Sequence, residues 1–363
     1  MHKFLLAALV GLSLFSCGSG AGRGASAGDG YDTLYTNRYA AKFCILGRGD
    51  TVVLRVTDPW QGAKGYSVDY AITKPAGRII CMSSSHVAFL DELGLADSIV
   101  GVSGLPFITN PTVHRNNVRD VGSDRYINYE LTVALRPDAM FVYEVSGENS
   151  SVTEKLMQLG LPVVYIADYL ESSPLGKAEW IMAFGALTGR MRQAERVFAD
   201  IEQRYLEVKN SAVSRHDGPR PKVMLNSPYR DIWYVPGDRS YMVRLIDDAG
   251  GDYLASGVDD DASRPISIET AYKLMLEADI WLSPSVEITD LASLRSGVPR
   301  FASMNVMKKG NVYNSDARGT PAGGSDFWES GAVRPDIVLK DLAKIFYPDA
   351  LPGYELYFFR RLE

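Results

Sequence analysis

Aromatic, hydroxyl and charged side chains directly follow several short apolar segments in both halves of this chain. Arginine recognises anionic groups through paired hydrogen bonds, and aromatic rings supply a large contact area to apolar surfaces. This mixture predicts binding of a bulky, partly apolar ligand with anionic or amide edges. The candidate ligand-binding residues are Ser84, Ser85, His86, Phe107, Tyr126, Tyr143 and Glu144 in the first half, and Ser227, Tyr229, Arg230, Trp233, Arg318, Ser325, Asp326 and Trp328 in the second.

Two of these carboxylates allow a second hypothesis, which is an enzyme. Glu144 and Asp326 are the pair that would serve a surface hydrolase acting on a glycan, provided that their carboxyl groups lie about 5 to 9.5 Å apart. The sequence contains no nucleophile elbow, phosphate loop or dinucleotide-binding motif. We therefore expect a binding protein without enzymatic activity and keep the hydrolase as the alternative.

The histidines offer little for direct capture of a metal ion. His86, His114 and His216 lie in separate regions, without the close spacing typical of metal sites. Neither a metal site nor a cofactor is therefore expected. His86 begins a predicted helix, where a neutral imidazole is favoured. It is interpreted either as an axial ligand to haem iron or corrinoid cobalt, or more simply as a capping or hydrogen-bonding residue.

Two glutamates occupy matching places in the two halves. Asn128 lies two positions before Glu130, and Ser267 lies two positions before Glu269. Asn and Ser are preferred helix N-caps, so each carboxylate is expected in a first turn, where the helix dipole favours negative charge. This stabilisation of the helix is by itself enough to explain why a Glu occurs at each of the two positions.

The segments that carry these side chains alternate between strand and helix patterns. Such alternation predicts parallel sheets covered by helices. The expected fold class is α/β, with two α/β lobes at residues 78–190 and 215–363 that have central, mostly parallel sheets. Strands are predicted at residues 78–82, 98–103, 139–144 and 162–167, then at 222–226, 231–235, 279–283 and 311–314, with helices of the second lobe at 241–249, 268–278 and 335–346.

Residues 191–214 lie between the two series and contain neither Pro nor Gly. Apolar residues recur at helical spacing from Met191 to Val208, and a helix of this length extends about 36 Å. We expect one long rigid helix that joins the lobes. An ordinary amphipathic core helix is the alternative interpretation.

The N-terminus has the pattern of an export signal, with Lys3, an apolar run and a small residue before Cys17. This pattern resembles the lipobox of bacterial lipoproteins, which implies that residues 1–17 are a signal and that Cys17 is lipidated. The glycine-rich residues 18–30 are expected to form a flexible tether. Residues 43–73 alternate between polar and apolar side chains, which predicts an antiparallel β extension at residues 31–77.

The composition limits the classes of binding partner to be expected. The net charge is −6, and the chain has no extended basic stretch, so nucleic acid is not an expected partner. No second apolar run is long enough to cross a bilayer. Cys44 and Cys81 either form a disulfide or remain buried thiols, and the sequence leaves both alternatives open.

Several segments in order resemble one family of transport proteins. They are residues 78–94, 99–103, 121–122, 128–138, 187–189, 234–237, 249–251 and 307–313. Together they are similar to the periplasmic substrate-binding proteins of ABC transporters that capture ferric siderophores, haem or cobalamin. The β extension lies outside this resemblance.

The resemblance implies a monomer that closes over a metal chelate and delivers it to an ABC permease with its ATPase. It implies that Glu130 and Glu269 dock against the permease, one from each lobe. With the lipobox, it implies an exported lipoprotein held at a periplasm-facing or cell-surface membrane. Ferric siderophore and cobalamin are equally expected ligands, ahead of haem.

Overall fold

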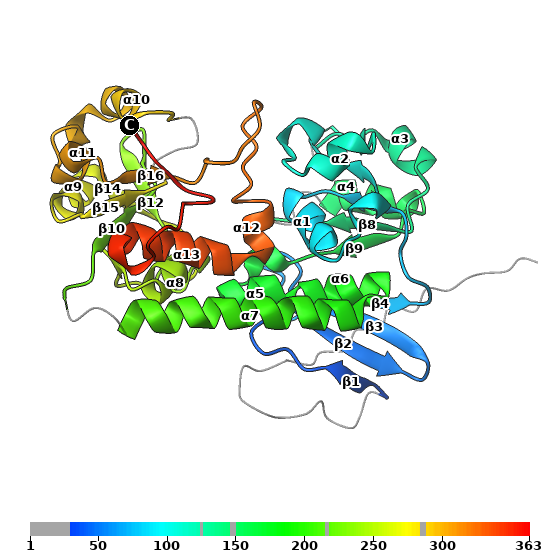
Figure 1. Cartoon of the computed structure of the whole chain (residues 1–363). Helices are drawn as coiled ribbons and strands as arrows, with labels where there is room; N and C mark the ends of the chain where they lie inside the picture. The colour runs from blue at the N-terminus through cyan, green and yellow to red at the C-terminus, as the bar shows by residue number, and fades with distance from the viewer. Residues whose placement is uncertain (1–29, 124–125, 146–149, 215–217, 284–287) are drawn as a thin grey trace, which may run out of the picture.

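The computed structural model describes residues 30–123, 126–145, 150–214, 218–283 and 288–363. The predicted signal, Cys17, the tether up to residue 29 and His216 lie outside these residues. Figure 1 shows two α/β lobes side by side above one long helix, with a small sheet near the first lobe. The predicted α/β fold class is confirmed.

A five-stranded parallel sheet forms the centre of the first lobe, in the order β7-β6-β5-β8-β9. β5, β8 and β9 are buried along their whole length, as expected for parallel strands covered on both faces. The strands are β5 (Ile79–Cys81), β6 (Ile99–Val102), β7 (Arg119–Asp120), β8 (Ala139–Val142) and β9 (Val163–Tyr165). The helices are α1 (Ser84–Glu92), α2 (Pro111–Arg115), α3 (Tyr129–Ala134), α4 (Ser150–Gln158), α5 (Pro174–Glu179) and α6 (Ile181–Thr188).

The second lobe repeats this arrangement with a sheet in the order β13-β10-β15-β16-β17. All neighbours are parallel except the last pair, β16 and β17. The strands are β10 (Lys222–Leu225), β13 (Asp252–Tyr253), β15 (Ile280–Leu282), β16 (Val312–Asn314) and β17 (Arg360–Arg361). The helices are α8 (Tyr241–Asp248), α9 (Ile268–Leu276), α10 (Leu291–Gly297), α11 (Asn305–Lys309), α12 (Ser330–Val333) and α13 (Pro335–Phe346).

The strand expected at residues 231–235 was assigned to the wrong sheet. It forms β12 (Ile232–Val235) in a separate antiparallel sheet with β11 (Pro228–Tyr229) and β14 (Arg264–Ser267). Arg230 has a positive φ of 58° in the tight turn between β11 and β12. β12 alternates between exposed and buried side chains, which is typical of an antiparallel strand with one solvated face.

One helix, α7 (Met191–Ser214), runs beneath both lobes, as predicted (Figure 1). Phe198 and Ile201 are buried in the core of the first lobe, whereas Tyr205 is buried in that of the second. The shorter helix α5 does the same, because Leu175 belongs to the second core and Ala178 to the first. The two lobes are therefore joined through helices that contribute side chains to both cores.

The β extension is a four-stranded antiparallel sheet, here called the N-terminal sheet. Its strands are β1 (Asp32–Tyr35), β2 (Phe43–Arg48), β3 (Thr51–Thr57) and β4 (Ser67–Ile72), in that order. Phe43, Ile45, Leu54 and Val56 point from one face into the core of the first lobe. The extension is thus packed onto the lobe rather than hanging from it.

The core of the first lobe also receives a residue from near the end of the chain. Val333, in α12, is fully buried in this core, among residues that otherwise lie between positions 43 and 201. Helix α12 contacts α1 and α5, and α13 then runs back along α7. Cys44 and Cys81 form no disulfide and are present as thiols in the described part of the chain.

Candidate ligand-binding site

The predicted ligand-binding residues follow parallel strands at the edge where those strands end. In the first lobe they follow β5, β6, β7 and β8, and in the second lobe most follow β10 and β16. The carboxyl ends of parallel strands meet at one edge of a sheet, which is where open α/β sheets bind ligands. Most of the residues predicted from the sequence therefore lie at the edge of each sheet where a ligand could bind.

Their exposure divides the predicted residues into three groups. The exposed ones are Phe107, Tyr126, Tyr229, Arg230, Arg318 and Trp328. The half-buried ones are Ser84, Tyr143 and Ser227, and the buried ones are Ser85, His86, Glu144, Trp233, Ser325 and Asp326. Only the exposed and half-buried residues can contact a ligand without a rearrangement.

Two buried residues require a correction. Trp233 is fully buried in the core of the second lobe, where its indole N–H donates to the carbonyl of Leu225 at 2.8 Å. His86 is also fully buried, between the rings of Phe141 and Phe184. Burial lowers the pKa of His86 to about 4, so the ring is neutral, but it lies beneath the surface that a chelate would reach.

The carboxylate pair of the hydrolase hypothesis is also buried. Glu144 is 1 % exposed and Asp326 is 6 % exposed. Asp326 accepts from the guanidinium of Arg318 at 2.9 Å and from the hydroxyl of Thr109 at 3.3 Å. Both of its oxygens are occupied, so this placement gives no support to glycan hydrolysis.

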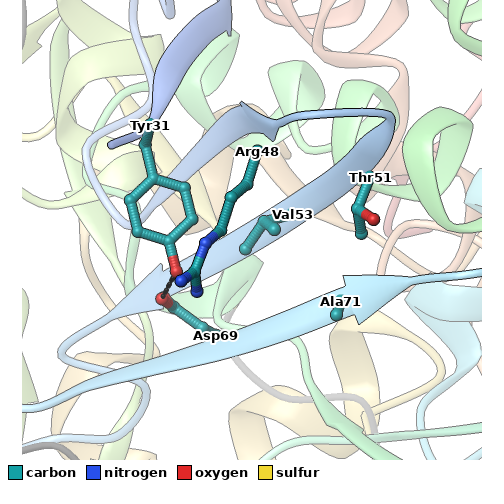
Figure 2. A pocket seen from close by; sticks show the side chains of 6 residues that line it. All are labelled: Tyr31, Arg48, Thr51, Val53, Asp69 and Ala71. Carbon is teal, nitrogen blue, oxygen red and sulfur yellow. Dashed lines mark hydrogen bonds between the residues drawn. The ribbon is translucent and has the colours of Figure 1, made fainter. Parts of the chain in front are cut away.

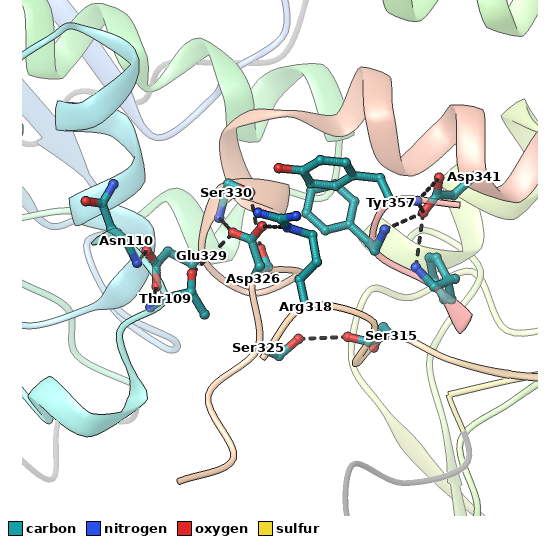
Figure 3. A network of polar contacts seen from close by, with 12 residues as sticks. Thr109, Asn110, Ser315, Arg318, Ser325, Asp326, Glu329, Ser330, Asp341 and Tyr357 are labelled. Carbon is teal, nitrogen blue, oxygen red and sulfur yellow. Dashed lines mark hydrogen bonds and ion pairs between the residues drawn. The ribbon is translucent and has the colours of Figure 1, made fainter. Parts of the chain in front are cut away.

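Asp326 belongs to a polar network between the first lobe and the loop before α12 (Figure 3). The backbone N–H groups of Thr109 and Asn110 donate to the two carboxylate oxygens of Glu329 at 2.7 and 2.8 Å. Burial, reinforced by the charge of Asp326, raises the pKa of Glu329 to about 7. Two backbone donors still face its carboxylate, so Glu329 fixes this loop to the first lobe.

Residues 318–326 form a hairpin that reaches the first lobe. Asp326 N–H donates to the Arg318 carbonyl at 2.9 Å, and Thr320 N–H donates to the Gly324 carbonyl at 2.9 Å. A Cβ atom at Gly324 would lie 2.0 Å from the carbonyl oxygen of Phe107, so only glycine allows this close approach. Arg318 is held at the base of the hairpin, where its guanidinium lies 4.5 Å from the ring centroid of Tyr357.

Sequence reasoning missed Thr109, Asn110 and Glu329. A signal existed for Asn110, because an Asn before Pro111 is typical of a helix start, and its side chain does cap α2 through the N–H groups of Thr112 and Val113. Nothing in the spacing of Glu329 indicates that its partners lie in the other lobe.

The two predicted docking glutamates lie where their caps indicated. Asn128 accepts from Leu131 N–H at the start of α3, and Ser267 accepts from Thr270 N–H at the start of α9. Glu130 and Glu269 are exposed in the first turns of these helices. Hydrogen bonds from its own backbone N–H and from the Ser267 hydroxyl lower the pKa of Glu269.

Two cavities of the described residues lie away from the predicted ligand residues. A shallow one of about 360 Å³ on the outer face of the N-terminal sheet is lined by Tyr31, Arg48, Thr51, Val53, Asp69 and Ala71 (Figure 2). A groove of about 600 Å³ lies beside α5, α7 and α8. In the described ranges, no group of three or more potential ligand side chains is placed to hold a metal ion. No described helix is both long and apolar enough to cross a membrane.

Comparison with known proteins decides the family. A family described as "Periplasmic binding protein" matches residues 79–318, which span both sheets from β5 to β16. The chain belongs to the periplasmic binding protein family. The match begins at the first residue of β5, so the N-terminal sheet of this periplasmic binding protein lies outside it. Proteins of this family act in transport and are not enzymes.

Three relatives illustrate the similarity of this periplasmic binding protein. An uncharacterized lipoprotein of Methanocaldococcus jannaschii is 28 % identical over 332 residues, covering 88 % of this chain and 75 % of that protein. An uncharacterized ABC transporter substrate-binding lipoprotein of Bacillus subtilis is 23 % identical, covering 77 % of this chain and 83 % of that protein. A periplasmic heme binding protein from Pseudomonas aeruginosa shares the fold, with a TM-score of 0.61 at 19 % identity, covering 79 % of this chain and 98 % of that one.

Proposed function

We propose that this protein is the lipid-anchored substrate-binding component of an ABC importer. It captures a metal chelate between its two lobes and delivers the chelate to a permease. The chelate is a ferric siderophore or cobalamin, with haem as the third choice. The name of the Bacillus subtilis relative supports the ABC role, and the Methanocaldococcus jannaschii and Bacillus subtilis relatives are both named lipoproteins, which supports lipidation at Cys17.

The observation that carries the proposal is a set of exposed aromatic side chains contributed by both lobes. Phe107 and Tyr126 of the first lobe are 53 % and 82 % exposed, and Tyr229 and Trp328 of the second part of the chain are 65 % and 55 % exposed. Aromatic side chains supply large contact areas to a partly apolar ligand, which supports a binding role for this set. Tyr126 and Trp328 lie in loops, Phe107 ends a short 3-10 helix after β6, and Tyr229 ends the short strand β11 after β10.

Two arginines add the charge that an anionic ligand requires. Arg318 is oriented by Asp326 and remains exposed, and Arg230 is exposed with its guanidinium 5.3 Å from the ring centroid of Tyr229. An arginine whose direction is fixed loses little entropy when it binds carboxylate or phosphate. These residues support a ligand with anionic edges and a broad apolar face.

Ligand capture is tested in two steps. Native mass spectrometry of the protein from its own cells identifies a carried molecule, and a tryptophan fluorescence titration then compares cobalamin, haem and several ferric siderophores. We expect one class to quench the fluorescence, and Phe107→Ala and Tyr229→Ala to weaken its affinity at least about tenfold. Tyr66→Ala, an exposed aromatic on the N-terminal sheet, is the matched control. Absence of quenching by every compound would refute capture of a chelate.

Docking is tested separately with the double variant Glu130→Lys/Glu269→Lys. Charge pairs at the rim of an interface set orientation and encounter rate, so we expect uptake by cells to be lost while ligand affinity is unchanged. Glu154→Lys/Glu207→Lys makes the same change in net charge at exposed positions on α4 and α7 and serves as the control. Loss of ligand affinity in the first double variant would contradict the docking role.

A further inference from the structure

The segment that links β1 to β2, here called the brace (residues 35–42), is held by two buried carboxylates. Three consecutive backbone N–H groups, those of Arg38, Tyr39 and Ala40, donate to Glu179 at 2.7, 2.8 and 2.7 Å. The next two, at residues 41 and 42, donate to Glu171 at 3.0 and 2.9 Å. Five successive backbone donors of the N-terminal extension are therefore satisfied by side chains of the first lobe.

These carboxylates are committed to the brace. Glu179 is fully buried and Glu171 is 5 % exposed. Each has one further donor, the Tyr35 hydroxyl on Glu179 at 2.7 Å and the Trp180 indole on Glu171 at 3.1 Å. A buried carboxylate is tolerated only when donors surround it, so moving the brace away would strip Glu179 of these donors and leave Glu171 with the Trp180 indole.

The brace also holds helix α7. The Tyr39 hydroxyl donates to Glu202 at 2.6 Å, and the guanidinium of Arg38 pairs with the same carboxylate. The Tyr39 ring meets that of Phe198 edge to face, with centroids 6.2 Å apart, and Arg38 lies 4.9 Å from the Phe198 centroid. On α5, a Cβ at Gly176 would lie 2.9 Å from the Tyr39 carbonyl oxygen, so the brace lies directly against that helix too.

The brace therefore contacts the helices that join the lobes. Tyr39 packs against the hydrophobic cores of both lobes. Tyr39 also lines the groove of about 600 Å³ beside α5, α7 and α8, together with Leu175, Tyr205, Val243 and Tyr253, which all belong to the second core. The brace, which is attached to the first lobe, therefore also reaches α5, α7 and the second core.

We propose that the brace fixes α5 against α7 and thereby restricts movement of one lobe relative to the other. The N-terminal sheet, which lies outside the family match, then acts as a stiffening element of the junction. The hydrogen bonds to Glu171 and Glu179 attach the brace to the first lobe. Tyr39 and Arg38 connect the brace to α7. This inference requires no particular ligand or permease.

The test measures the distance between the lobes by double electron–electron resonance. Spin labels are attached at Glu154→Cys in α4 and Lys273→Cys in α9, in the full chain with Cys17 and Cys44 replaced by Ser. We expect one narrow distance distribution for this protein, and loss of the single peak through broadening or splitting in Tyr39→Ala and in Glu202→Ala. Asp69→Asn breaks the Arg55–Asp69 pair on the outer face of the same sheet and is expected to keep the narrow peak.

Folding of each variant is checked by thermal unfolding. If Tyr39→Ala does not fold, Glu202→Ala and Tyr39→Phe carry the test, because the first removes both polar contacts with α7, the second removes the hydroxyl bond, and both leave Glu171 and Glu179 untouched. An unchanged narrow distribution in the folded variants overturns the proposal. Equal broadening in Asp69→Asn also overturns it, since the effect would then come from the sheet as a whole and not from the brace.

Discussion

Glu329 is buried, lies beside a second carboxylate and connects the two lobes through hydrogen bonds. Its carboxylate accepts two backbone N–H groups of the first lobe, yet it lies beside the carboxylate of Asp326. The other charged groups near this contact are Arg318, which pairs with Asp326, Glu92 of α1, which pairs with Arg334 just after α12, and Asp91, beside Asn110. These neighbouring charged groups have partners of their own. Protonation of Glu329 near neutral pH therefore changes the charge of this one group.

We expect Glu329→Gln to reduce the pH dependence of stability. The pKa is about 7 in the folded protein and about 4.3 when unfolded, so the folded state binds the proton more tightly. The stability that Glu329 contributes is therefore full below pH 4.3 and is lost as the pH rises through 7, with a slope of up to about 1.4 kcal/mol per pH unit.

The measurement is urea denaturation of both proteins from pH 4.5 to 8. The free energy of unfolding of the original protein, relative to the variant, should fall across this range. Glu154→Gln, at an exposed glutamate, is the control and should leave the pH dependence unchanged. If the free energies of unfolding of the original protein and of Glu329→Gln change in parallel with pH, the pKa of Glu329 is the same in the folded and unfolded states.

The positions and burial of individual side chains were the features hardest to predict from the sequence. Exposed Phe107 and Tyr229 could be placed at strand ends because a strand pattern fixes where its loop begins. Trp233 could not, because its burial depends on β12 pairing with β14, a strand that comes much later in the chain. Glu329 depends on a chain crossing between lobes that local sequence does not encode.

At the scale of elements, the close crossing of α6 and α7 depends on a glycine. A Cβ at Gly185 would lie 2.7 Å from the Cβ of Ala194 and 3.3 Å from the carbonyl oxygen of Arg190. Both helices bury side chains in the first core, and they contact each other there. The crossing distance is thus set by the absence of a side chain.

We expect Gly185→Ala to destabilise the protein by about 1 to 3 kcal/mol, because overpacking forces α6 away from α7. Thermal and urea unfolding measure the loss. Gly297→Ala, at the end of α10, is the matched control because its Cβ would have no neighbour within 4 Å. Equal stability of Gly185→Ala and the original protein would mean that the two helices separate without cost.

The elements themselves were largely predictable. The spacing from Met191 to Val208 predicted α7, and the alternation of residues 51–57 predicted β3, because burial on one face imposes a strict period. The packing of the N-terminal sheet onto the first lobe was not predictable. It depends on Glu171 and Glu179, whose partners are backbone groups far away in the sequence.

At the scale of the whole molecule, the connection between lobes is stiff. The helix α7 is unbroken over its 24 residues, and both α5 and α7 contribute to both cores. Large hinge motions require loop residues that absorb changes in φ and ψ, and the connecting helix offers none. The family resemblance and the two-lobed α/β architecture followed from ordered segments of sequence, and the family match confirms the resemblance.

We therefore expect little change in overall shape on ligand capture. Small-angle X-ray scattering with and without the molecule identified by mass spectrometry should give the same radius of gyration within error. A clear decrease on binding, as in proteins that close by a hinge, would contradict a rigid connection.

The burial of Val333 in the core of the first lobe has a consequence for biosynthesis. A ribosome must pass residue 333 before this side chain becomes available, so the first lobe cannot complete its core until most of the second lobe has been synthesised. Halves expressed separately would each lack part of their interior, and the intact protein should melt in a single cooperative transition.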